Sequence, residues 1–168
     1  GVILYVCADK EATGSRVADS VMLKAVGKSC TYDPETGMAT RKPLTAVLDP
    51  DFDESYTNIK TMTEEIFDVY ITGYNGDIDS MKDTVKTNIE NYLLEREPYI
   101  RGLSVDNNRV DDISVNNLIG IVNEIAIANT ASFTGVNLYH ASESIAAYQL
   151  GRGELAKLGT LYVNGVAV

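Results

Sequence analysis

Hydrophobic and polar residues follow two different periods in the second half of the chain, and these periods predict its main strand and its two helices. Residues 66–72 alternate strictly, with Phe67, Val69 and Ile71 on one face, which is typical of a half-buried strand. A helix capped by Asp77 and stopped at Pro98 is predicted by apolar residues at helical steps: Ile78, Met81, Val85, Ile89, Tyr92 and Leu93. A second helix follows the cap residue Ser114 and carries Leu118, Val122, Ile125 and Ala126 on one face.

Shorter elements surround these helices. Strands are predicted over 100–105, 109–113, 133–140 and 160–163, a short helix over 143–148, a glycine-rich connection over 151–159, and a turn at Asn164-Gly165. The succession predicts an α+β fold with small mixed sheets. Amphipathic helices are expected to pack on one face, as in a split-βαβ-like sandwich.

The first part of the chain predicts a βαβ-like segment. A strand over 1–9 precedes a helix that Ser15 is suited to cap and that Gly27 is suited to end, and a second strand is expected over 43–48. This succession favours a right-handed βαβ crossover.

The acidic, turn-forming residues 49–55 predict a boundary between two domains, which would span 1–56 and 57–168. The sequence starts at Gly1, at the beginning of the first predicted strand and without an initiator methionine. We therefore expect a piece of a longer chain.

Composition narrows the possible partners. The 168 residues include 24 acidic and 14 basic side chains, for a net charge of −10, and the hydrophobic fraction is 45%. These values are typical of a globular protein. The acidic balance argues against nucleic-acid and anionic-membrane partners, because binding to either requires clustered Lys and Arg. No apolar run reaches the roughly 18–20 residues of a membrane span.

Histidine and cysteine are scarce. His140 is the only histidine, so one chain cannot supply a site with two imidazoles, and no motif pairs it with a Ser, Cys or Asp. Cys7 lies in an apolar run and is expected to be a small buried residue. Cys30 is expected to be a free thiol, since two cysteines are too few for a disulfide framework.

Several motifs that could carry chemistry have simpler interpretations. Asp49, Asp51 and Asp53 match the first ligands of a calcium loop, but Glu54 and Lys60 occupy the positions that need glycine and glutamate. The segment Gly151-x-Gly153-x-x-Ala156 resembles a dinucleotide-binding loop, but too little chain follows it for the required βαβ unit.

Three carboxylate pairs remain: Glu64-Glu65, Asp77-Asp79 and Asp111-Asp112. The last two pairs stand at predicted helix starts, where negative charge is stabilising. We therefore assign no catalytic, cofactor-binding or metal-binding residue and expect no enzyme. Ten tyrosines against three phenylalanines favour protein contacts, although tyrosine is also a common strand residue.

The order of the segments resembles the baseplate J-like proteins of contractile phage tails and related injection systems. Residues 2–9 and 17–26 look like the end of the family's middle domain, and 41–47 are similar to its RPL-T-x-V stretch. The C-terminal domain of the family is matched by an opening strand at 67–74, a strand, serine cap and helix at 111–127, and a closing GEL-x-x-LG run at 153–160.

This resemblance implies that 1–56 is the C-terminal part of a middle α/β domain and that 57–168 is a C-terminal α+β domain. It also implies a structural role in the virion's tail baseplate, assembled in the cytoplasm of a bacterial host. The partners would be other wedge and hub proteins, together with further copies in a ring, and no cofactor would be needed. Two alternatives remain: a secreted adhesion domain, or a ligand-binding, metal-binding or hydrolytic domain with an acidic cleft from Asp49, Asp51, Asp53, Asp77 or Asp111.

Overall fold

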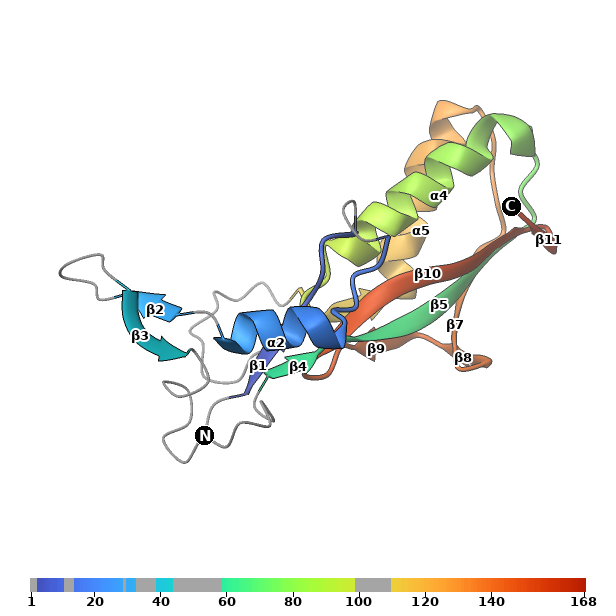
Figure 1. Ribbon diagram of the computed structural model, residues 1–168. Helices are drawn as coiled ribbons and strands as arrows, with labels where there is room; N and C mark the ends of the chain where they lie inside the picture. The colour runs from blue at the N-terminus through green and yellow to red at the C-terminus, as the bar shows by residue number, and fades with distance from the viewer. Residues whose placement is uncertain (1–2, 11–13, 29, 33–38, 44–58, 99–109) are drawn as a thin grey trace. The chain divides into compact units, whose positions relative to one another are not determined.

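The chain forms two compact units, Gly1–Thr63 and Glu64–Val168. The computed structural model describes residues 3–10, 14–28, 30–32, 39–43, 59–98 and 110–168 (Figure 1). The predicted domain boundary lies between residues 56 and 57. Residues 59–61, shortly after this predicted boundary, form a strand that pairs with a strand of the first unit.

The first unit pairs strands from its two ends. β1 (Leu4–Val6) runs parallel to β4 (Ile59–Thr61), and α2 (Ser20–Lys28) contacts β4. β2 (Cys30–Tyr32) and β3 (Ala39–Pro43) form a separate antiparallel pair. The strand predicted over 43–48 falls, beyond Pro43, outside the described residues. The parallel strand that the structure pairs with β1 is β4.

Two local predictions for this unit are wrong. Asp19, rather than Ser15, caps α2, because Asp19 Oδ1 accepts a hydrogen bond from Met22 N at 2.8 Å. Ser15 Oγ accepts from Val17 N at 3.1 Å, and Val17 forms an antiparallel bridge with Cys7, so the backbone there is extended. Cys7 is an exposed free thiol and not a buried side chain.

The second unit is built on a mixed sheet with the strand order β11-β10-β5-β7-β8. Its strands are β5 (Thr63–Thr72), β7 (Gly135–His140), β8 (Glu143–Ile145), β10 (Glu154–Val163) and β11 (Val166–Ala167). β5 and β7 are antiparallel, and β5 and β10 run in the same direction (Figure 1). Hydrogen bonds from Thr160 to Asp68 and from Asn164 to Ile71 follow this parallel register.

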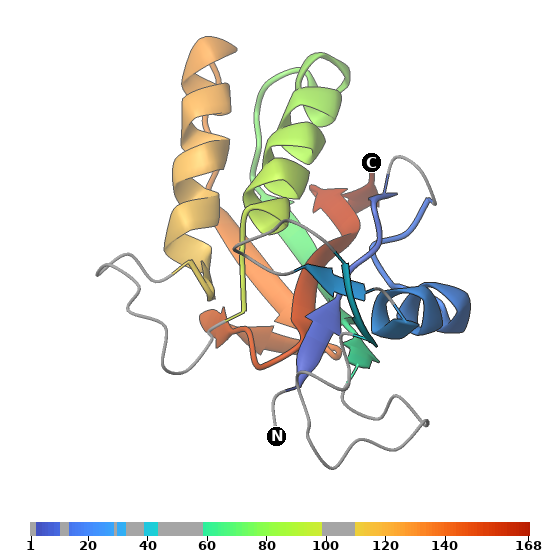
Figure 2. The same ribbon diagram turned by 60° about the vertical axis from the view of Figure 1, so that its left-hand side comes forward.

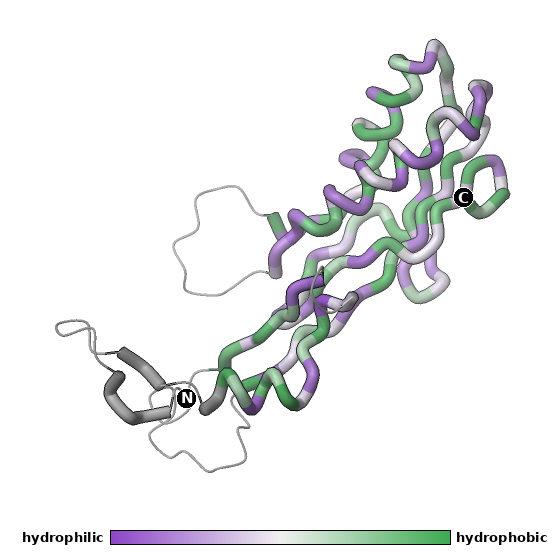
Figure 3. The backbone as a smooth tube through the Cα atoms, turned by 45° about the horizontal axis from the view of Figure 1, so that its top comes forward, coloured by the Kyte–Doolittle hydropathy of each residue, from purple (hydrophilic) through white to green (hydrophobic). Residues whose placement is uncertain are grey.

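Two helices cover one face of this sheet. α4 (Ile78–Leu94) contacts β10, and α5 (Val115–Ala128) contacts β7; the helices lie side by side (Figures 1 and 2). Their predicted apolar faces are buried against the sheet in one core, whose fully buried members include Phe67, Val69, Ile71, Met81, Val85, Ile89, Leu118, Val122, Leu138 and Leu161. In Figure 3, hydrophobic and hydrophilic positions alternate along both helices. The predicted α+β class is confirmed.

The predicted caps of both helices are confirmed. Asp77 accepts a hydrogen bond from Asp79 N, and Ser114 accepts one from Asn117 N. Tyr92 of α4 also ties the two helices together, because its hydroxyl accepts hydrogen bonds from Ser114 N and from the Asn117 side chain. No helix in the described part of the chain is long and apolar enough to cross a membrane.

The short helix predicted over 143–148 is wrong. β8 covers Glu143–Ile145, and β9 (Ala147–Gln149) pairs with β6 (Asp112–Ser114) in a separate two-stranded sheet. A two-residue turn at Ala141 and Ser142, both with positive φ, returns the chain from β7 into β8. Neither residue carries the Asn-Gly or Asp-Gly signal of such turns, so the sequence did not indicate the hairpin.

β10 begins earlier than the sequence indicated. The glycine-rich segment was predicted to be a connection into a strand at 160–163, but the strand starts at Glu154, directly after Gly153 with its positive φ of 75°. The predicted turn at Asn164-Gly165 is confirmed and joins β10 to β11.

Candidate functional site

Among the described residues, the acidic side chains singled out in the sequence do not form one cluster. Asp49, Asp51 and Asp53 lie outside the described residues. Within the described ranges, no group of three or more His, Cys, Asp or Glu side chains is placed to hold a metal ion.

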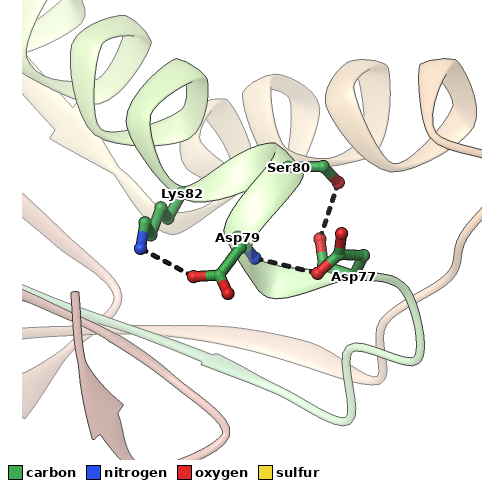
Figure 4. Close-up of polar contacts among 4 residues, drawn as sticks. All are labelled: Asp77, Asp79, Ser80 and Lys82. Carbon is green, nitrogen blue, oxygen red and sulfur yellow. Dashed lines mark hydrogen bonds and ion pairs between the residues drawn. The ribbon is translucent and has the colours of Figure 1, made fainter.

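Asp77 and Asp79 form hydrogen bonds and an ion pair at the N-terminus of α4 (Figure 4). Asp77 Oδ1 accepts a hydrogen bond from Asp79 N at 3.1 Å, and the Asp77 carbonyl accepts one from Ser80 Oγ at 2.8 Å. The Asp79 carboxylate pairs with Lys82 Nζ at 2.7 Å, and the hydrogen bond from Lys82 lowers the pKa of Asp79. These contacts stabilise a helix N-terminus and leave the two carboxylates with structural partners.

In each of the other two carboxylate pairs, the two residues have different surroundings. Glu64 contacts Lys157 and Glu65 contacts His140, each at 2.7 Å, so adjacent carboxylates serve different partners. Asp111 is 2% exposed and its carbonyl accepts a hydrogen bond from Leu150 N, whereas Asp112 begins β6.

His140 belongs to an aromatic cluster on the helix-facing side of the sheet. Its Nε2 lies 2.7 Å from Glu65 Oε2, and its ring centroid lies 5.1 Å from Phe67 and 4.6 Å from Tyr148. Tyr148 donates a hydrogen bond to Glu154 Oε2 at 3.1 Å. The hydrogen bond and ring contacts described for His140 join it to Glu65, Phe67 and Tyr148.

The same cluster explains the glycines that resemble a dinucleotide loop. Glu154 Oε2 also accepts a hydrogen bond from Gly151 N at 2.7 Å, so a carboxylate occupies the position beside that backbone amide. Gly153 supplies the left-handed turn before β10, and Ala156 is buried. The segment is a turn into a strand.

The opposite face of the sheet carries a row of three tyrosines. Tyr70 on β5 stacks on Tyr162 of β10, with ring centroids 4.2 Å apart and an interplanar angle of 11°. Tyr139 of β7 lies on the other side of Tyr70, with centroids 4.8 Å apart. These positions alternate with buried core residues, so the rings stand on the face that α4 and α5 do not cover. We call Tyr139, Tyr70 and Tyr162 the tyrosine row.

The surroundings of Tyr70, the central residue of this row, raise its pKa above the ordinary value for tyrosine. Loss of hydration raises the pKa of Tyr70 most, followed by the hydrogen bond with Tyr162, and the charge of Asp68 acts in the same direction. Asp68 Oδ1 accepts a hydrogen bond from Thr160 N at 2.7 Å, which fixes the carboxylate within the sheet. Ile66, on the same face, is 53% exposed.

The excess of tyrosine was the sequence signal for this surface, and the alternation over 66–72 placed Tyr70 on the polar face. Tyr139 and Tyr162 join Tyr70 only through strand pairing, which the local pattern did not specify. No family model and no curated protein matches the chain.

Proposed function

We propose that the chain is a structural component of a contractile phage-tail baseplate, or of a related prophage or injection system, and that it works through protein–protein contacts. The partners would be other wedge and hub proteins and further copies of the chain in a ring, without catalysis or a cofactor. The proposal rests on the ordered resemblance of the sequence segments to the baseplate J-like proteins.

The structural observation that supports an assembly role is the tyrosine row. Tyrosine offers rigid, amphipathic contact area at a low cost in side-chain entropy, and interfaces are enriched in it. Tyr70, Tyr139 and Tyr162 pre-order one another by ring contact, so a partner would not have to immobilise each ring separately.

The outer side of α5 supports the same role. Ile127 is 68% exposed and Ile119 is 37% exposed, and they lie about two helical turns apart, outside the row of buried residues. Apolar side chains that recur on one side of a surface helix are typical of a contact with another protein.

The direct test is mass spectrometry of contractile particles purified from the organism that encodes the chain. We expect peptides of this chain in the particles, in a ratio to hub proteins that fits a ring, and sheath, tube and hub genes beside its own gene. Absence from the particles, or neighbouring genes for secretion and adhesion, would overturn the proposal in favour of the adhesion alternative.

A surface test uses the full chain in solution. Sedimentation velocity over a range of concentrations, alone and with particle proteins, is compared for the parent chain and Tyr70→Ser/Tyr162→Ser. We expect the double variant to associate at least about tenfold more weakly, since buried aromatic anchors carry much of the binding energy of an interface. Asn137→Ser, on the same sheet face, is the matched control. Equal association of the parent and both variants would show that the tyrosine row is not the contact.

A further inference from the structure

Both Asn-Gly dipeptides of the chain, Asn75-Gly76 and Asn164-Gly165, lie at the same end of the sheet. The segment after β5 carries the first, and the turn between β10 and β11 carries the second. Each asparagine side chain holds a neighbouring loop. Asn75 Oδ1 accepts a hydrogen bond from Ser132 N at 2.8 Å, and the Asn164 amide binds the backbone of Tyr74.

Asn164 is held more completely than Asn75. Its Oδ1 accepts from Tyr74 N at 3.0 Å, and its Nδ2 donates to the Tyr74 carbonyl at 2.8 Å. Its own backbone N–H donates to the carbonyl of Ile71 at 2.8 Å. Both polar atoms of the side chain are therefore used, and the amide carbon between them is held against the Tyr74 backbone.

An asparagine before glycine can convert spontaneously to an acid. The glycine nitrogen loses its proton and attacks the side-chain carbonyl carbon, the amide nitrogen leaves as ammonia, and a five-membered succinimide results. Water then opens the ring to aspartate or isoaspartate, so the balance is one water consumed and one ammonia released. Glycine favours the attack because it has no side chain to obstruct it and its backbone is freer than that of other residues.

We propose that Asn164 is a modification site of this kind, which the native contacts with Tyr74 keep nearly inert and whose conversion releases the segment after β5. Ring closure requires the Asn164 side chain to leave both hydrogen bonds, so it requires local opening of the turn. The turn itself is accessible, because Gly165, at a φ of 82°, has nothing within 4 Å of where a Cβ would stand.

Conversion is expected to disrupt the contact rather than preserve it. An ionised aspartate has no donor, so the Tyr74 carbonyl would lose its partner and face a negative oxygen instead. Isoaspartate would also lengthen the backbone within a two-residue turn and disturb the pairing of Val163 with Val166. Tyr74 itself is 4% exposed, so the loosened segment carries a core side chain.

The first experiment uses the unmodified chain. The native protein and a synthetic peptide of residues 160–168 are incubated together in mildly alkaline buffer, and conversion at Asn164 is followed by peptide mass spectrometry with isoaspartate detection. We expect conversion in the native chain to be at least about tenfold slower than in the peptide, because only the locally opened fraction reacts. Equal rates in chain and peptide would overturn the proposal.

The second experiment tests the consequence. Hydrogen exchange at the Tyr74 amide is compared in the parent chain, Asn164→Asp and the matched control Asn75→Asp. We expect Asn164→Asp to accelerate exchange at Tyr74 by at least about tenfold, and Asn75→Asp to have a much smaller effect there, because the Asn164–Tyr74 contact remains. Unchanged exchange in Asn164→Asp would overturn the second half of the proposal. If this variant does not fold, the same readout is taken on native chain aged to partial conversion.

Discussion

Among single residues, Gly159 in β10 occupies a position with no room for a larger side chain. Inward-facing residues of β10 are Ala156 and Leu158 before it but Leu161 and Val163 after it, so the strand shifts by one residue at this point. A Cβ on Gly159 would overlap Asp68 Oδ1 and lie 2.7 Å from Ile66 Cγ2. The Asp68 carboxylate accepts the hydrogen bond from Thr160 N at the same place, so it cannot move away without leaving that amide unpaired.

We therefore expect Gly159→Ala to lower the free energy of unfolding by about 1–3 kcal/mol. Gly120→Ala is the matched control, because Gly120 lies within α5 and has nothing within 4 Å of its added Cβ. That change should raise the free energy of unfolding by up to about 1 kcal/mol through helix propensity. Urea unfolding measures both, and effects of the same sign would contradict the argument.

Tyr148 makes stability depend on pH in the alkaline range. Burial, followed by the hydrogen bond to Glu154 and its negative charge, raises the pKa of Tyr148 from the ordinary value of 10.0 to about 12. The folded chain thus binds the phenolic proton more tightly than the unfolded chain. The resulting contribution to stability is present below the unfolded pKa of about 10 and is lost as the pH rises towards about 12.

We expect Tyr148→Phe to lose less stability than the parent chain between about pH 10 and pH 12, because the variant lacks this ionisation. Chemical unfolding at several pH values measures the difference. The same comparison at about pH 8, where the phenol is neutral in both states, provides the baseline for the lost Glu154 hydrogen bond. If the free energy of unfolding of both proteins fell by the same amount between about pH 10 and pH 12, the result would count against a raised pKa of Tyr148.

At the level of elements, the turn between β7 and β8 has an unfavourable local backbone conformation. Ala141 and Ser142 adopt φ values of 49° and 68°. Positive φ values are sterically unfavourable for most residues, and glycine, asparagine and aspartate tolerate them best. The antiparallel pairing of His140 with Glu143 nevertheless holds them in place.

Replacing this turn by Asn-Gly, as Ala141→Asn/Ser142→Gly, should raise the free energy of unfolding by roughly 1 kcal/mol, because Asn-Gly is suited to two successive residues with positive φ. Ser144→Gly, two residues further along in β8, places a glycine in a strand and should lower it by about 0.5–1 kcal/mol. Thermal unfolding of the two variants beside the parent chain distinguishes a turn effect from a general effect of glycine.

The elements that could be predicted are those with strong local signals. α4 and α5 combine an apolar helical period with a cap residue, Asp77 or Ser114, and both caps were found where expected. The predictions failed where a distant contact decides the backbone. The bridge between Cys7 and Val17 prevents Ser15 from starting a helix, and the pairing of β8 with β7 replaces the helix expected over 143–148.

For the whole molecule, the core of the second unit should behave as one cooperative body, because both helices and the strands β5, β7 and β10 contribute to it. Leu118 is fully buried in this core, whereas Ile127 on the same helix is 68% exposed.

We expect Leu118→Ala to lower the free energy of unfolding by about 2–5 kcal/mol and to accelerate hydrogen exchange in α4, β5 and β10 as well as in α5. Ile127→Ala, the surface control, should change stability by no more than about 0.5 kcal/mol. Acceleration confined to α5 would show that the core does not open as a unit.

The α+β class, the two helices with their caps, and the buried face of β5 could be predicted from the sequence, because each follows from periodicity and capping within a few residues. The order of the strands in the sheet depends on tertiary contacts. The parallel pairing of β10 with β5 joins residues about 90 positions apart, and this pairing completes the tyrosine row and brings Asn164 to Tyr74. No local pattern encodes such contacts, since they depend on which distant segments share one core.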